Sequence, residues 1–121
     1  MWTYRISTGE IVDSNNVICG LGYSGFGNRK NNPTGIAAHN LGPIPIGLYH
    51  IEEPKDTDTH GPFVLPLAPS LENQMFGRSG FLIHGDSLAH PGEASEGCVI
   101  LDRATREKIV ASGDRLLEVV A

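Results

Sequence analysis

The chain has 121 residues, enough for one hydrophobic core but too few for two, so we expect a single domain spanning residues 1–121. Nine scattered Lys and Arg residues against 14 Asp and Glu residues give a formal net charge of -5, which argues against a nucleic-acid partner. No apolar run reaches the roughly 20 residues that span a bilayer, and the N-terminus does not resemble a secretory signal. We therefore expect a protein made in the cytoplasm without a signal peptide and without a membrane span.

Short strands are expected in the first half of the chain. Residues 2–6, 10–14 and 16–25 are apolar or alternating segments separated by turn residues, a pattern typical of strands joined by hairpins. Residues 25–47 are so rich in Gly, Asn and Pro that they predict a long loop, and long ordered loops in small domains often carry function. A strand is expected again over residues 48–53.

The middle of the chain predicts a turn followed by two more strands. The first, over residues 63–69, is apolar but contains Pro66. Because proline cannot donate to a sheet ladder, this segment suits an edge strand or a bulge. Residues 70–80 predict a short helical turn and a loop, and residues 81–84 predict a buried strand.

One helix is expected near the C-terminus, over residues 103–112. Asp102 can accept the free amides of its first turn, and Gly113 can adopt the left-handed conformation that ends a helix. Strands over residues 98–101 and 115–120 flank it. Together with 15 glycines and eight prolines, these elements predict a mainly β domain with one short C-terminal helix.

The two cysteines have different surroundings. Cys19 follows Val17 and Ile18 in an apolar run, which predicts a small buried hydrophobic residue. Without a secretory signal, we do not expect a disulfide between Cys19 and Cys98. Cys98 instead follows Ser-Glu-Gly at the end of a polar loop, with His84 fourteen residues earlier at the end of an apolar run.

Cys98 and His84 are a candidate nucleophile and general base. A thiolate attacks carbonyl carbon far better than a thiol, so a thiolate poised beside an imidazole should make Cys98 react with iodoacetamide faster than Cys19 near neutral pH. The N–H groups of Gly97 and Cys98 could stabilise a developing oxyanion. The alternative is that Cys98, which precedes Val-Ile-Leu, belongs to the core and that His84 is a surface or satisfied residue.

Several polar residues are further candidates for the same site. Asp86 and Ser87 lie in the loop between the two, where a crowd of polar and acidic groups is typical of a functional site. Tyr23 and Ser24, in the segment GYSG, either face the cleft or lie in an ordinary hairpin in which Tyr23 has a packing role. His90 is a second candidate base, but we favour His84 because a strand places a reacting group more reliably than a loop. No grouping of His, Cys and Asp has zinc-site spacing, so neither a metal nor a cofactor is expected.

The segments GRSGFLIHGDS and PGEASEGCVIL resemble the signature of the L,D-transpeptidase superfamily, in which His-Gly precedes Ser-x-Gly-Cys by about the length of a loop. The whole chain is more closely similar to the type VI secretion L,D-transpeptidase effector family. WTYRISTGEIVD, GLGYSGFG, NNP, LGPIPIGLYHI, THGPFVLPLAP and MFGRSGF resemble the landmarks of that family in the same order. The resemblance implies an L,D-transpeptidase-like domain, with a curved or barrel-like sheet.

The resemblance also implies roles for individual residues. Cys98 would be the nucleophile, His84 its base, and Gly85 the residue whose carbonyl orients the imidazole. Ser95 and Gly97 occupy matching positions of the Ser-x-Gly-Cys element.

Two positions depart from the superfamily pattern. Glu96 stands where many members have a second histidine, and Ile100 stands where an arginine usually contacts the substrate. Arg78 is a candidate replacement for that arginine, and a solvated surface residue is the alternative at this position.

The implied reaction is cysteine-dependent acyl transfer on peptidoglycan stem peptides. Water as the acceptor would make the protein an L,D-carboxypeptidase, whereas an amine would make it an L,D-transpeptidase or a D-amino-acid exchange enzyme. The family implies an antibacterial toxin that acts in the periplasm of a target bacterium, with an immunity protein and a secretion apparatus as partners. Two alternatives stay open: a non-catalytic module that binds muropeptides or a partner, and a cytosolic cysteine hydrolase of another D-amino-acid amide.

Overall fold

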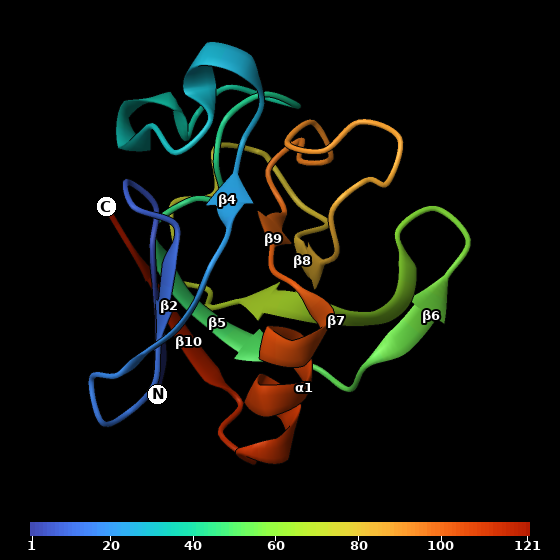
Figure 1. Cartoon of the computed structure of the whole chain (residues 1–121). Helices are drawn as coiled ribbons and strands as arrows, with labels where there is room; N and C mark the ends of the chain where they lie inside the picture. The colour runs from blue at the N-terminus through green and yellow to red at the C-terminus, as the bar shows by residue number, and fades with distance from the viewer.

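The computed structural model describes residues 1–121 and shows a mainly β protein with one α-helix (Figure 1). None of its helical segments combines the length and apolar character that crossing a membrane requires. The expected fold class is confirmed. In chain order the elements are β1 (Trp2–Arg5), β2 (Glu10–Val12), β3 (Ile18–Leu21), β4 (Tyr23–Ser24), the 3-10 turns η1 (Gly27–Arg29) and η2 (Pro33–Gly35), β5 (Gly47–Ile51), β6 (Lys55–Thr57), β7 (Gly61–Pro69), β8 (Leu82–His84), β9 (Val99–Ile100), α1 (Arg103–Ala111) and β10 (Leu116–Val120).

The strands form one curved, unclosed sheet in the order β3-β2-β1-β10-β5-β7-β8-β9-β4, and β6 pairs with β7 beside this path. Two strand pairs are parallel, β1 with β10 and β8 with β9, and the others are antiparallel. The two edge strands, β3 and β4, are consecutive in the chain and separated by Gly22 alone. One continuous segment of the chain, residues 18–24, therefore supplies the strands at both edges of the sheet.

The core takes residues from most strands and from α1. The helix begins after Asp102, whose carboxylate accepts the Thr105 N–H at 2.8 Å, and Gly113 follows its end with φ of 72°, so both expected end signals are confirmed. Ile109 is the helical residue that reaches the core. The core cluster comprises Trp2, Tyr4, Ile6, Ile11, Ile44, Tyr49, Ile51, Leu65, Leu67, Phe81, Ile83, Val99, Leu101, Ile109, Leu117 and Val119.

The cysteines are both free, as expected. Cys19 is only partly buried, although it packs against the core cluster. Its thiol contacts the carboxylate of Asp13 at 3.7 Å and the carbonyl of Val17 at 3.5 Å. The prediction of a buried apolar residue is therefore only partly right, because this side chain lies where the core meets polar groups.

Three expectations for the middle of the chain are wrong. The strand with Pro66 is central, because β7 lies between β5 and β8. The Pro66 carbonyl accepts the N–H of Glu52, which follows β5, so the side of Pro66 that lacks a donor faces the residue just beyond the last paired residue of β5. The expected turn before this strand contains β6, and residues 70–80 form turns without a helix.

We predict that Gly22→Ala destabilises the protein, because a Cβ on Gly22 would overlap the carbonyl oxygen of Ile100 and crowd Leu101. The expected loss in the free energy of unfolding is about 3 kcal/mol, the upper end of the usual cost of overpacking. Urea unfolding measures it. Gly27→Ala is the control, because Gly27 has φ of 62° but no neighbour within 4 Å, and it should cost only about 1 kcal/mol. Equal losses would mean that the backbone at Gly22 does not approach Ile100 as closely as described.

Candidate active site

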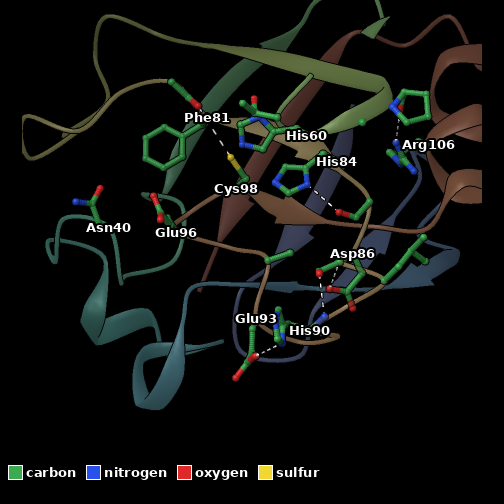
Figure 2. Close-up of a pocket in the computed structure, with 18 of the residues that line it drawn as sticks. Asn40, His60, Phe81, His84, Asp86, His90, Glu93, Glu96, Cys98 and Arg106 are labelled. Atoms are coloured by element: carbon green, nitrogen blue, oxygen red, sulfur yellow. Dashed lines mark hydrogen bonds and ion pairs between the residues drawn. The ribbon is translucent and has the colours of Figure 1, made fainter. Parts of the chain in front are cut away.

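A cavity of about 840 Å³ opens where β8 ends and β9 begins (Figure 2). Its volume lies in the range of about 300 to 1,000 Å³ that is usual for ligand pockets. Of the residues predicted for the site, the wall contains Cys98, His84, Gly85, Asp86 and Ser87. The remaining predicted residues, which are Tyr23, Arg78, Ser95 and Gly97, do not line this cavity.

The parallel pairing of β8 with β9 brings Cys98 and His84 together. Ile83 pairs with Val99 and His84 with Ile100, so Cys98 lies beside the residue two positions before His84. Alternate residues of a strand face the same side of a sheet. The thiol and the imidazole therefore lie on one side, and Figure 2 shows both directed into the cavity.

The His84 ring is held in one tautomer. His84 is only 3% exposed, and its Nδ1 lies 2.8 Å from the carbonyl oxygen of Gly85. Because a carbonyl only accepts hydrogen bonds, Nδ1 carries the hydrogen and Nε2 keeps its lone pair. Burial lowers the pKa of His84, and the nearby His60 and Arg106 act in the same direction, although the Gly85 carbonyl opposes them. The His84 imidazole is therefore neutral at pH 7.

The surroundings of Cys98 favour the protonated thiol. Its sulfur lies 4.0 Å from the carbonyl oxygen of Gly80 and makes no hydrogen bond to His84. The pKa of the Cys98 thiol is raised to about 11, mainly by burial and in smaller part by Glu96, while the Leu82 N–H and Arg78 act in the opposite direction. The resting pair is thus a thiol and a neutral imidazole, and not the poised thiolate that we expected from the sequence.

Ser95 fixes the backbone that leads to Cys98. Its hydroxyl is fully buried, accepts the N–H groups of Gly25 at 2.9 Å and Gly97 at 3.1 Å, and donates to the carbonyl of Cys98 at 2.6 Å. The Gly97 N–H is therefore engaged and does not serve as the oxyanion donor that the sequence suggested. The Cys98 N–H has no acceptor in the protein and is the donor that remains.

Arg78 supports two loops and does not line the cavity that contains Cys98. Its side chain is 7% exposed. Nη1 donates to the carbonyls of Ile36 and Pro43 at 2.6 and 2.7 Å, and Nη2 donates to those of Gly42 and Glu96 at 2.8 and 3.2 Å. Four acceptors occupy the four N–H groups of these nitrogens. Arg78 is therefore neither the free substrate contact nor the surface residue that we considered.

Tyr23 and Asp86 shape the loop between His84 and Cys98. The Tyr23 hydroxyl donates to Asp86 at 2.6 Å and accepts the Ala94 N–H at 3.0 Å. The Asp86 carboxylate also accepts the N–H groups of Ser87 at 2.8 Å and Gly92 at 3.1 Å. In this structure both side chains are used to hold the loop, although Asp86 also reaches the cavity wall.

Ser24, considered with Tyr23 as a residue facing the cleft, is instead fully buried and donates to the Gly97 carbonyl at 2.9 Å. Sequence reasoning missed two residues at the site. His60, from the connection between β6 and β7, lies with its ring centroid 4.7 Å from that of His84. Arg106 of α1 is 5% exposed and lines the cavity. Their separation in sequence leaves no spacing signal by which to group them with Cys98.

His90 lies on the wall of the cavity but is loosely held. It is exposed, and its ring makes one ion-pair contact of 3.7 Å with the carboxylate of Glu93. No three His, Cys, Asp or Glu residues gather as a group that could hold a metal ion.

The fold and the cavity define a class, a small mainly β domain in which two adjacent parallel strands present a cysteine and a histidine to one cavity. The family model of the Tlde1 domain matches residues 20–119, and the chain belongs to that family. This is the type VI secretion L,D-transpeptidase effector family, so membership implies a type VI effector with a transpeptidase-like role in peptidoglycan modification. Comparisons with curated proteins and with solved structures gave no match.

We predict that alkylation of Cys98 by iodoacetamide is slow at pH 7 and accelerates about tenfold per pH unit up to near pH 11, because only the thiolate reacts and burial raises the pKa of Cys98 to about 11. Peptide mass spectrometry after timed labelling at each pH measures this rate. Cys19 in the same sample is the internal reference. A plateau reached below pH 9 would contradict the assignment of a protonated resting thiol.

Proposed function

We propose that the chain catalyses cysteine-dependent acyl transfer on the stem peptides of peptidoglycan. One observation carries the proposal: His84, with Nδ1 held by the Gly85 carbonyl and Nε2 free, shares a cavity wall with Cys98 in a chain of the Tlde1 family. A base that is fixed in one tautomer and a nucleophile on the same side of the sheet are the two groups that acyl transfer requires.

In the proposed first step, His84 Nε2 takes the thiol proton while the Cys98 sulfur attacks the carbonyl between the diamino acid at position three and the terminal D-alanine. The tetrahedral intermediate carries an oxyanion, which the free Cys98 N–H can stabilise. The C–N bond then breaks, and the imidazolium returns its proton to the departing amine of D-alanine. A thioester between Cys98 and the shortened stem remains.

The acceptor in the second step defines the activity. Water activated by His84 would release the tripeptide stem and regenerate the thiol, which is an L,D-carboxypeptidase reaction. A D-amino acid or the amine of a second stem would give exchange or transpeptidation by the same route. No step of this chemistry needs a metal or a cofactor.

The biological setting belongs to the same proposal. An effector of this kind would act as an antibacterial toxin in the periplasm of a target bacterium, where peptidoglycan is accessible. Its partners would be the secretion apparatus that delivers it and an immunity protein that protects the producing cell. Family membership supports both partners.

A second candidate function is a non-catalytic module that binds muropeptides or a partner. The pKa of about 11 that burial gives the Cys98 thiol, and the direction of that thiol toward Gly80 instead of His84, favour it. Hydrogen bonds of catalytic groups are often long in ligand-free sites and shorten when substrate binds, so these observations do not outweigh the first proposal.

Incubation of the purified protein with sacculi, followed by mass spectrometry of the released muropeptides, tests the proposal. We expect shortened or exchanged stems with the wild type and none with Cys98→Ala, which removes only a small, partly buried side chain. Unchanged stems with retained binding to sacculi would establish the binding module instead. If the protein neither cleaves nor binds sacculi, peptidoglycan is excluded as its ligand.

We predict that His84→Ala lowers turnover about a hundred- to ten-thousand-fold, which is the usual contribution of a general base. The matched control is His90→Ala, because His90 lines the same cavity but is exposed and has only the Glu93 contact. It should change the rate by a few fold at most. Initial rates of D-alanine release from a stem tetrapeptide measure both. An inactive His90 variant beside an active His84 variant would overturn the assignment of the base.

A further inference from the structure

Arg106 is a buried charge without a direct ion pair, and the carboxylates of Asp102 and Glu107 act on it only from a distance. It projects from α1, is 5% exposed, and takes part in none of the ion pairs of the protein. Arginine is almost never this buried unless it is paired, because removing a cation from water is costly. The distribution of its hydrogen bonds shows which part of the guanidinium lacks a partner.

Two of its three nitrogens are fully used by backbone carbonyls. Nε donates to Leu101 at 3.1 Å and to Asp102 at 3.3 Å, and Nη1 donates to Pro62 at 3.0 Å and to Phe63 at 2.8 Å. Nη2 donates to nothing in the protein. These contacts hold the guanidinium in one orientation, and they leave two N–H groups free on one nitrogen.

The free nitrogen lies at the cavity wall. A Cβ on Gly85 would lie 2.9 Å from Arg106 Nη2, so Nη2 is reachable because residue 85 has no side chain. Both residues line the cavity that contains Cys98. In Figure 2, Arg106 lies beyond His84 as seen from Cys98.

Arg78 shows what a satisfied buried arginine looks like in the same protein. It is nearly as buried and also has no ion pair, but both its Nη1 and its Nη2 have two carbonyl acceptors each. The vacant Nη2 of Arg106 is therefore not a general property of buried arginines in this fold.

The carboxylates of the cavity wall do not neutralise Arg106. Asp86 accepts hydrogen bonds from Tyr23 and from backbone N–H groups, and Glu93 contacts His90. Glu96 is adjacent in sequence to the Gly97 that precedes Cys98 and makes no ion pair with Arg106. The cavity therefore offers, at the end near α1, a guanidinium nitrogen that has no acceptor in the protein.

We propose that Arg106 Nη2 forms an anion subsite that binds a carboxylate of the ligand, on the side of His84 away from Cys98. Hydrogen bonds from a guanidinium to a carboxylate are strong, and both partners gain when a buried cation receives its counter-ion. The identity of the ligand as a stem peptide, which carries several carboxylates, rests on the function proposed above. The existence of the anion subsite does not depend on that proposed function.

An acetate titration of the wild-type protein, followed by NMR, tests the subsite without any substrate. We expect acetate to shift the Gly85 amide and the Arg106 side-chain resonances saturably, and acetamide, which has the same shape without the charge, to leave them unchanged. Identical responses to the two probes, or no response to either, would overturn the proposal. Because this titration uses only the wild-type protein, its result does not require any variant to fold.

Stem tetrapeptides with one carboxylate amidated at a time test the role of the subsite in recognition. We expect one amidation to raise KM of the wild type roughly 10- to 100-fold, the value of a charge-assisted hydrogen bond, and to have no further effect in Arg106→Gln. Arg103→Gln is the matched control, because it removes an exposed charge from the same helix, where Arg103 pairs with Glu107. It should respond to amidation as the wild type does.

An Arg106→Gln protein that is as sensitive to every amidation as the wild type would overturn the role in recognition. If the wild type cleaves none of the peptides, the proposed function fails, while the acetate titration still decides whether the subsite exists.

Discussion

The buried guanidinium of Arg78 holds the region around Cys98 together. It binds carbonyls of the long loop after β4 and also the carbonyl of Glu96, so one charge joins two segments that are far apart in the chain. Without it, four carbonyls would lose a charged donor, and an unsatisfied buried carbonyl costs about 1–3 kcal/mol. Arg78 also explains Gly97, because a Cβ there would collide with Nη2 of Arg78 and φ of 138° disfavours any other residue.

Cys98 is consequently placed by polar contacts as much as by the core. The residue after it enters β9 and pairs with β8, while the residues before it are held by Ser24, Ser95 and Arg78. Such a network is stabilising only when every member is satisfied, and it then selects one backbone conformation. The thiol thus lies at the boundary between a rigid strand pair and a rigid loop. A precise position relative to His84 follows from both.

The sequence predicted the features that local patterns determine. Alternation and turn residues indicated most strands, and Asp102 and Gly113 marked the helix, because these signals act within a few residues. The placement of Cys98 and His84 on one cavity wall was also predicted. The prediction of an edge strand at Pro66 was wrong because a central strand can contain proline where the neighbouring strand ends. The point at which the neighbouring strand ends is a property of the whole sheet, not of the local sequence.

The two buried arginines could not have been predicted in their observed roles. Each is held by backbone carbonyls, and a carbonyl is present at every residue, so no side-chain pattern marks the partners. Arg78 had been a candidate for a substrate contact, with a solvated surface residue as the alternative, whereas Arg106 had not been considered. Only the folded chain shows how the two side chains differ. Arg78 has no free N–H on its terminal nitrogens, whereas Nη2 of Arg106 has no acceptor in the protein and lies at the cavity.

The electrostatics of the cavity keep the Cys98 thiol and the His84 imidazole neutral. Burial raises the pKa of Cys98 and lowers that of His84, so transfer of the thiol proton to the imidazole is unfavourable before a ligand arrives. Arg106 contributes to this state, because its positive charge lowers the pKa of His84. A carboxylate bound to Arg106 would cancel that repulsion, raise the pKa of His84 and make it a stronger base for the thiol. Under the proposed function, the ligand that fills the anion subsite would therefore also help to generate the nucleophile that attacks it.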